Sequence, residues 1–274
     1  MNTSPPLRSS LYECAKLTLM APVALARVLV IGVIANAINA VCWWGVQWND
    51  DFETFDAVVT RLFRAWCAVA SLRVTVSGEE HLRDARRLNQ CVVVFNHVSI
   101  LDFVVLLRTA VFSFVTHEHW ASVPCAAQFI KYSRFIFIRS GVQTTATIVH
   151  RVASGVHPLV AIAPEGTLSN GSGLLKFKTG AFAPLAPVLP VLLRYPFRHH
   201  NPAWTVDAHI LFRVYRILTQ FVTPVRVEFL PVVAPTAGET PAEFAQRVRG
   251  AMAAALNVPL VEQDAGDRRQ KTVA

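Results

Sequence analysis

The chain has 274 residues, of which 53% are apolar and only 16% are charged, whereas an average soluble domain has about 25% charged residues. The length supports a large core, and the shortage of charge indicates contact with a membrane. The formal net charge is +8, with basic residues scattered along the chain. Together with the apolar N-terminus, this favours lipid or phosphorylated substrates over nucleic acid as partners.

The cysteines argue against a disulfide framework and against a structural zinc site. They are odd in number and none has CxxC spacing, so we expect small apolar core residues in a reducing compartment. The five are Cys14, Cys42, Cys67, Cys91 and Cys125.

The first predicted element is an apolar segment, Leu17 to Trp44, interrupted by Arg27, Asn36 and Asn39. A transmembrane helix needs about 20 apolar residues, and the part after Arg27 is slightly short of this. Three interpretations stay open: a spanning helix, a re-entrant or monotopic anchor, and a cleaved signal peptide. We divide the chain into an anchor, residues 1–54, and a second domain, residues 55–274.

Residues 55–72 place apolar side chains near helical spacing, with Arg61 and Arg64 to one side and Trp66 among them. This pattern predicts an amphipathic helix. Such a helix lies either at a bilayer interface, with its arginines reaching lipid phosphates, or packed on the domain.

Beyond this helix, the pattern predicts an α/β fold with a mixed central sheet flanked by helices, behind the N-terminal hydrophobic membrane anchor. Residues 72–78 alternate as an edge strand does, and residues 91–96 form a β-branched run typical of a strand buried on both faces. The other predicted elements are a helix over 99–112, strands within 134–141, 158–167, 186–195 and 224–233, and a C-terminal helix over 240–256. Polar clusters follow several strand ends, where open α/β sheets place their sites.

The segment "FNHVSILDF" carries four polar side chains in an otherwise apolar stretch. One interpretation is purely structural: Ser99 is the N-cap and Asp102 the N3 residue of a helix, and His97 is a core imidazole. The alternative is catalytic. A strand-to-helix turn brings Asp102 to one imidazole nitrogen of His97, which leaves the other nitrogen as a general base. No serine lies in a G-x-S-x-G elbow, so such a base would activate a hydroxyl of the substrate.

Four segments in this order, "NHVSILD", "RFIFIR", "PEGT" and "APVLPV", resemble the four sequence blocks of the glycerolphosphate/lysophospholipid acyltransferase superfamily. The segments "FKTGAFAPLAPVLPVLLRYP" and "VRVEFLPVVAP" are most similar to the branch that acylates lysophosphatidylcholine and lysophosphatidylethanolamine. The resemblance extends over roughly residues 17–259.

The resemblance implies that His97 deprotonates the free hydroxyl of a lysophospholipid, which then attacks the thioester of acyl-CoA, and that Asp102 orients His97. It implies a phosphate-binding role for Arg139, whose planar guanidinium makes bidentate bonds. The alternative for Arg139 is a surface residue at a strand end.

The third block implies substrate-binding roles for Glu165, Gly166 and Thr167. Gly166 lets the backbone approach the acceptor, Thr167 offers a hydroxyl, and Glu165 either binds acceptor hydroxyls or holds Arg139. Lys178 is a candidate for a phosphate of either substrate, or else a solvated surface residue. Leu168 stands where many members of the superfamily have an arginine, which slightly disfavours a phosphomonoester acceptor.

We therefore expect an acyl-CoA-dependent lysophospholipid O-acyltransferase, with acyl-CoA as co-substrate, no cofactor and no metal site. His117 and His119 are accompanied by no carboxylate or cysteine array. The alternatives are a lysophosphatidate acyltransferase, a CoA-independent transacylase and a lipid-binding protein without activity. The expected partners are the two substrates and a bilayer. Because acyl-CoA is cytosolic, we expect an endomembrane location, such as the endoplasmic reticulum, with the catalytic domain facing the cytosol.

Overall fold

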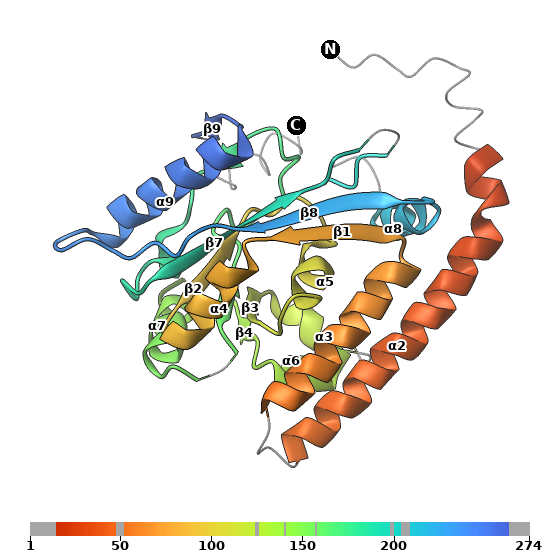
Figure 1. Cartoon of the computed structure of the whole chain (residues 1–274), viewed down its shortest axis with the longest axis horizontal. Coiled ribbons are helices and arrows are strands. Elements are labelled where there is room, and N and C mark those ends of the chain that lie inside the picture. Colours follow the sequence, from red (N-terminus) through yellow and green to blue (C-terminus); the bar gives the residue numbers. More distant parts are fainter. Residues whose placement is uncertain are drawn as a thin grey trace.

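The computed structural model describes residues 15–47, 52–123, 126–139, 141–156, 158–197, 200–203 and 209–262. Its centre is a seven-stranded sheet in the order β1–β8–β7–β2–β5–β3–β4, with helices on both faces (Figure 1). Neighbouring strands are parallel except β7 and β8, which are antiparallel. The predicted fold class, a mixed sheet flanked by helices, is confirmed.

The strands of the central sheet are β1 (Leu72–Ser77), β2 (Val92–Phe95), β3 (Ser113–Thr116), β4 (Ile136–Phe137), β5 (Val160–Ile162), β7 (Val188–Arg194) and β8 (Thr223–Phe229). A separate pair consists of β6 (Leu174–Leu175) and β9 (Leu260–Val261). Because β2, β3, β4, β5 and β7 run in the same direction, their carboxyl ends lie at one edge of the sheet.

The helices are α2 (Ala21–Gln47), α3 (Phe52–Val69), α4 (Glu79–Leu88), α5 (Asp102–Leu107), α6 (Ala127–Tyr132), α7 (Gly141–Ala153), α8 (Ile210–Leu218) and α9 (Pro241–Leu256). Two short 3₁₀ segments are η1 (Glu118–Ser122) and η3 (Thr179–Ala181).

The side chains of β2 alternate between two cores, one on each face of the sheet. Val93 and Phe95 belong to the core that includes residues of α3, α4 and α5, whereas Val92 and Val94 belong to the core that includes residues of α7 and α9. All four are buried, as predicted for residues 91–96. The catalytic turn predicted after this strand is therefore attached to a strand that is buried on both faces.

Helix α2 is held against the rest of the molecule by the polar residues that interrupt its apolar sequence. Arg27 donates to the carbonyl oxygens of Leu218 and Gln220 at the end of α8, and the Asn39 side chain accepts from the first amides of α6. Near its C-terminus, Gly45 lets α2 approach Tyr132 and Phe55 closely, because a Cβ there would lie 3.1–3.2 Å from their rings. Among the described residues, α2 is the one helix long and apolar enough to cross a bilayer.

The structure corrects the predicted helix over 99–112, because α5 ends at Leu107 and the strand β3 begins at Ser113. Asp56 of α3 explains the early end: its carboxylate accepts from the amide of Val111 (2.9 Å), which directs this amide away from a helical partner. The strand predicted within 134–141 is also shorter, since Arg134 has a positive φ of 52°. By contrast, α9 has the predicted capping box of Thr240 and Glu243.

Cys42, Cys67 and Cys91 are free and buried in the core, as predicted. Burial raises the pKa of each of these thiols to about 12, so all three are inert at neutral pH. Cys14 and Cys125 lie outside the described residues. The predicted amphipathic helix of residues 55–72 is α3, which packs on α2, α5 and β1. The division at residue 54 stays a prediction.

Candidate active site

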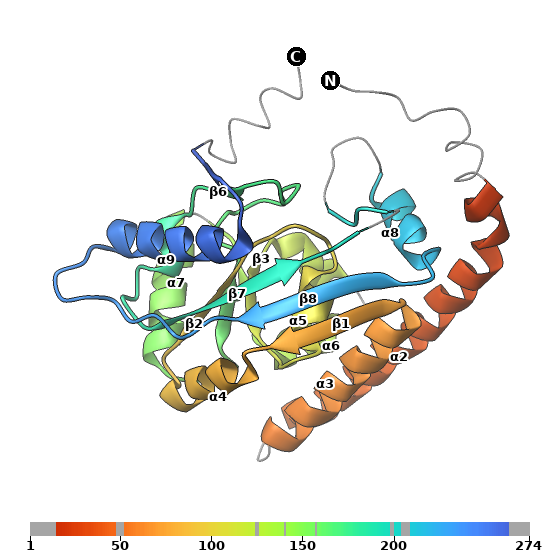
Figure 2. The same ribbon diagram turned by 45° about the horizontal axis from the view of Figure 1, so that its top comes forward.

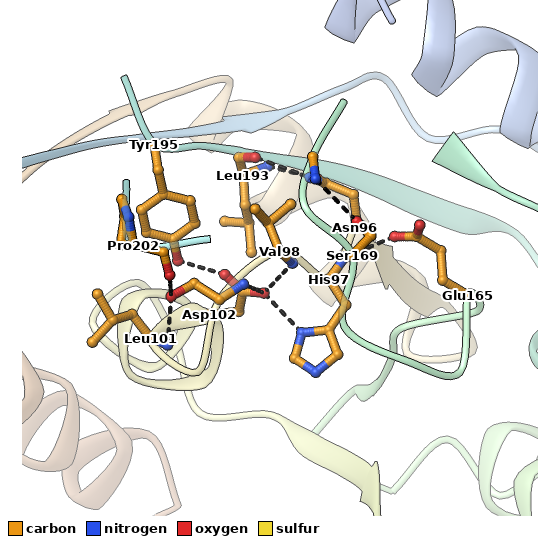
Figure 3. Close-up of polar contacts among 12 residues, drawn as sticks. Asn96, His97, Val98, Leu101, Asp102, Glu165, Ser169, Leu193, Tyr195 and Pro202 are labelled. Carbon is orange, nitrogen blue, oxygen red and sulfur yellow. Dashed lines mark hydrogen bonds and ion pairs between the residues drawn. The ribbon is translucent and has the colours of Figure 1, made fainter. Parts of the chain in front are cut away.

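The turn between β2 and α5 brings His97 and Asp102 into contact. His97 Nδ1 lies 2.8 Å from Asp102 Oδ2 (Figure 3). The Asp102 carboxylate is fully buried, whereas 14% of the His97 side chain is exposed. Among the described residues, no hydrogen bond occupies Nε2 of His97. This is the geometry that a general base requires, with one ring nitrogen fixed and the other accessible.

Asp102 also organises the backbone of the turn. Its Oδ2 accepts from the amides of Val98 (2.8 Å) and Ser99 (3.0 Å) in addition to His97. The capping-box interpretation is therefore wrong in detail. Asp102 is the first residue of the helix, Leu101 is the N-cap, and Ser99 Oγ donates to the carbonyl of Pro202 (2.9 Å). The carboxylate holds the turn and the imidazole together rather than merely capping a helix.

Tyr195, at the end of β7, is a site residue that the sequence reasoning missed. Its hydroxyl donates to Asp102 Oδ1, and the side chain is buried. Burial and the Asp102 carboxylate raise the pKa of Tyr195 well above its ordinary value, so the phenol stays a neutral donor. A tyrosine at the end of an apolar strand is the signal that was available, because a buried tyrosine hydroxyl needs a partner.

Glu165, in the loop after β5, connects two segments by accepting from their backbones. Its Oε1 accepts from the amide of His97 (2.9 Å), and its Oε2 accepts from the amide of Leu175 (3.1 Å). The side chain is buried, and burial raises the pKa of this carboxyl to about 7 despite the two amide donors. Among the described residues no ion pair joins Glu165 to Arg139, and both carboxylate oxygens of Glu165 accept from backbone amides instead.

Two further contacts fix His97 and its predecessor. The carbonyl of His97 accepts from the amide of Ser169 (2.8 Å), so the loop after β5 bonds to both sides of this residue. The Asn96 side chain exchanges two hydrogen bonds with the backbone of Leu193 in β7 (2.9 and 2.8 Å). The catalytic turn, residues 96–102, is thus bonded to β7 on one side and to the loop after β5 on the other.

Gly166 and Lys178 lie together beside this loop. Gly166 has a positive φ of 68°, and a Cβ there would lie 2.6–3.0 Å from the Lys178 side chain. The Lys178 amide donates to the carbonyl of Pro164 (2.8 Å), and its side chain is exposed. Thr167 is half-buried in the same loop. The close approach that Gly166 permits is therefore that of the Lys178 side chain.

Arg139 lies in a separate cavity of about 650 Å³ between β4 and α7, which we call the basic cavity. It is lined by Arg134, Arg139, His150 and Arg151, and the lining residues include no Asp or Glu. The Arg139 amide donates to Thr144 Oγ1 (3.1 Å), and its side chain is exposed. Burial and the neighbouring Arg134 lower the pKa of Arg151. The basic cavity is suited to an anion, but its lining includes none of the other predicted site residues.

Metal ligation finds no support in the described part of the chain. No group of three or more His, Cys, Asp or Glu side chains is found there in a geometry that could hold an ion.

Residues 73–194 match the family model described as Acyltransferase. A lysophospholipid acyltransferase of Arabidopsis thaliana is 29% identical over 279 residues, which cover 94% of this chain and 50% of that protein. A lysophosphatidylcholine acyltransferase of Drosophila melanogaster is 36% identical over 176 residues, 61% of this chain and 33% of that protein. The chain thus spans half the length, or less, of these relatives. The resemblance found in the sequence is confirmed.

A solved structure has the same fold. The crystal structure of the 1-acyl-sn-glycerophosphate (LPA) acyltransferase from Thermotoga maritima matches with a TM-score of 0.61 at 20% identity, covering 85% of this chain and 96% of that chain. At this identity the likeness describes the fold alone.

Proposed function

Because residues 73–194 belong to the acyltransferase family, we propose that the protein transfers an acyl group from acyl-CoA to the free hydroxyl of a lysophospholipid. The observation that carries the proposal is the contact between His97 Nδ1 and Asp102, with Nε2 left accessible. The names of the relatives, lysophospholipid and lysophosphatidylcholine acyltransferases, support the acceptor class.

In the proposed reaction, His97 Nε2 takes the proton of the acceptor hydroxyl as the oxygen attacks the thioester carbonyl carbon. A new C–O bond forms, the C–S bond breaks, and the thiolate of CoA leaves. The proton held on Nε2 then passes to that thiolate, so His97 returns to its starting state. Asp102 stabilises the imidazolium that exists between these two proton transfers.

The geometry of the pair supports this role through the tautomer of His97. Because Asp102 is a carboxylate that already accepts from two backbone amides, it is an acceptor toward Nδ1. Nδ1 therefore carries the proton, and Nε2 has the free lone pair that a base needs.

The phosphates of the substrates require cations, and the proposal assigns them to Arg139 and Lys178. Arg139 faces the acid-free basic cavity, and Lys178 lies over Gly166 beside the loop that holds His97. Thr167 in this loop offers its hydroxyl to the acceptor. The structure changes the role that we assign to Glu165: both its oxygens accept from backbone amides, so we propose that it positions His97.

The headgroup of the acceptor is the finer part of the proposal. A phosphodiester acceptor such as lysophosphatidylcholine or lysophosphatidylethanolamine is favoured, because Leu168 stands where an arginine would help to bind a phosphomonoester. The alternatives remain lysophosphatidate as acceptor and a phospholipid as acyl donor in place of acyl-CoA.

The proposal also includes a membrane anchor that does not span. Helix α2 contacts α3, α6 and α8, so a spanning α2 would draw these helices into the bilayer as well. An anchor in the plane of the membrane leaves the catalytic domain on the cytosolic side, where acyl-CoA is made. Protease digestion of the C-terminus in sealed endomembrane vesicles tests this orientation, and protection of the C-terminus would contradict it.

The test of the activity is acyl transfer from labelled oleoyl-CoA by the wild type and by His97→Ala, each offered lysophospholipids that differ only in headgroup. A general base contributes about 10²- to 10⁴-fold, so we expect a loss of this size with the fold retained. His81→Ala, a half-buried histidine of α4, is the matched control. A loss of only a few-fold in His97→Ala would contradict the role, and transfer from a phospholipid alone would indicate the transacylase.

A further inference from the structure

Helix α8 carries exposed apolar side chains, and so do Phe221 and Val222 shortly after its end. Leu211 is 71% exposed and Phe221 is 69% exposed, and Ile210, Phe212 and Val222 are exposed as well. We call these five residues the α8 patch. Large apolar side chains exposed singly are normal, but a contiguous group of them marks an interaction surface.

The α8 patch continues the apolar surface of the N-terminal half of α2. Arg27 of α2 donates to the carbonyls of Leu218 and Gln220, and Lys16 Nζ donates to Gln220 Oε1 (2.7 Å). Figure 1 and Figure 2 both show α8 beside this half of α2. On the face of α2 that carries Arg27, Val23 and Val30 are 40% and 46% exposed. The two helices therefore offer one apolar surface, and Arg27 joins them.

The charged side chains of the two segments that form this surface are all basic. Residues 15–47 contain Lys16 and Arg27, residues 209–222 contain Arg213 and Arg216, and neither segment contains Asp or Glu. Burial, together with the charges of Arg216, Lys16 and Arg213, lowers the pKa of the nearby His200 to about 4, so His200 is neutral at physiological pH. Apolar side chains in segments whose charged residues are all basic complement an anionic bilayer surface.

The α8 patch lies at the same edge of the sheet as the catalytic turn. Strand β7 ends at Arg194, and β8, which begins directly after the patch, pairs antiparallel with it, so that Arg194 opposes Arg226. The chain that leaves β7 also contacts the turn, because the carbonyl of Pro202 accepts from Ser99 Oγ. A bilayer that meets the patch therefore meets the edge of the sheet that carries His97.

We propose that the α8 patch is a second membrane-contacting element, which inserts beside α2 into the interface of an anionic bilayer. The patch fixes the tilt of the domain, so that the edge with His97 faces the lipid surface. A single in-plane helix would allow the domain to roll about its axis, and a second contact prevents this. That the orientation delivers a lysophospholipid to His97 rests on the proposed function, whereas the contact itself does not.

The test uses a fluorescent thiol label at one position in the full chain. Cys14 and Cys125 are replaced by Ser, and the three buried cysteines do not react, so Val222→Cys labels selectively. The matched control is Leu88→Cys, because both side chains are 49% exposed and Leu88 precedes β2 at the opposite edge of the sheet. The vesicles contain phosphatidylcholine and phosphatidylglycerol with bromine atoms on the acyl chains.

We expect the label at position 222 to be quenched at least about twofold, as for a side chain inserted into the headgroup and acyl boundary, and the label at position 88 to be unaffected. Equal quenching at both positions would overturn the proposal. So would a label at position 222 that responds only to protein concentration, since a second copy of the chain would then cover the patch. Quenching does not depend on turnover, so failure of the acyl-transfer assay would leave this result unchanged.

A kinetic measurement tests the consequence. Leu211→Ser combined with Phe212→Ser should raise KM several-fold for a long-chain lysophospholipid in vesicles and leave KM for a soluble short-chain acceptor unchanged. A rise for both acceptors would contradict the assigned orientation.

Discussion

The catalytic turn follows β2, the basic cavity lies between β4 and α7, and the two are built in opposite ways. In the turn, the side chain of Asp102 accepts from three partners through one oxygen and from Tyr195 through the other. In the basic cavity, arginines and His150 face one another with no acid in the lining. The hydrogen bonds of the turn are complete without a ligand, whereas the basic cavity has positive charge that a bound anion would neutralise.

Because of this difference, substitutions in the turn and substitutions in the basic cavity should have different kinetic effects. Changes in the turn should lower kcat, because they disturb groups that are arranged before substrate arrives. Changes in the basic cavity should raise KM, because they remove interactions that form only with substrate. The following predictions test this distinction, beginning with the largest expected effect.

Asp102→Asn should be the most damaging conservative substitution. The carboxylate has two acceptor oxygens, whereas the amide has one. The NH₂ group of the amide would therefore face another hydrogen-bond donor. It also removes the charge that stabilises the imidazolium of His97. We expect kcat to fall about 10³- to 10⁴-fold, as for other Asp–His pairs.

Asp84→Asn, on the exposed face of α4, is the control for this substitution and should keep wild-type activity. If Asp102→Asn lowered kcat less than about tenfold while the fold was retained, the assigned role of the pair would be wrong.

Glu165→Gln should have the next largest effect. One of the amides of His97 and Leu175 would lose its acceptor, and an unsatisfied buried group costs about 1–3 kcal/mol, so we expect kcat to fall about 10- to 100-fold. Glu80→Gln in α4, whose side chain is 62% exposed, is the control. Unchanged kcat in Glu165→Gln would show that the clamp on His97 is dispensable.

The pKa of Glu165 gives this prediction a pH dependence. The folded chain raises this pKa from an ordinary 4.5 to about 7, so between these values the folded state binds the proton more tightly than the unfolded state. The free energy of unfolding should therefore fall by about 3 kcal/mol as pH rises through this window. Activity should rise over the same window, because only the ionised carboxylate accepts from both amides. Unfolding of the wild type and of Glu165→Gln at pH 5 and pH 8 tests this, and equal pH dependence in the two would contradict it.

The sequence predicted those parts of the fold and site that depend on neighbours along the chain. The buried run of β2, the capping box of α9 and the pairing of His97 with Asp102 are all determined within a few residues. The errors arose where a distant residue intervenes. Asp56 ends α5 through the amide of Val111, and Tyr195 reaches Asp102 from 93 residues away. No local sequence pattern predicts a hydrogen bond between residues so far apart in the chain. A buried tyrosine hydroxyl is nevertheless expected to have a hydrogen-bond partner.

The contacts of Glu165 could not be predicted for the same reason. The sequence identifies a glutamate in a loop after a strand, and only the fold brings the amides of His97 and Leu175 to its two oxygens. Likewise, Arg27 looked like a charge that a membrane helix must tolerate, and it proves to bind the end of α8. In both cases the partner of the residue could not be known from the sequence.

Arg139→Ala should distinguish the basic cavity from the turn. Hydrogen bonds to charged groups contribute about 1.5–3 kcal/mol, so losing one phosphate contact should raise KM roughly tenfold or more with little change in kcat. The KM that rises, for acyl-CoA or for the lysophospholipid, identifies the phosphate that the cavity binds. Arg87→Ala, an exposed arginine of α4, is the control. If neither KM changed, Arg139 would be the surface residue of the alternative interpretation.

Tyr195→Phe should have the smallest effect. It tests whether Tyr195 positions His97 and Asp102 or only stabilises the fold. The variant keeps the packing of the ring and loses only the hydrogen bond to Asp102 Oδ1, while three donors remain on Oδ2, so we expect kcat to fall about fivefold at constant KM. Tyr215→Phe also loses one hydroxyl bond, to the carbonyl of Leu17, far from the turn. It should lower stability by about 1 kcal/mol and leave kcat unchanged. If the two variants lost stability alike and neither lost kcat, Tyr195 would contribute to the fold and not to the arrangement of His97 and Asp102.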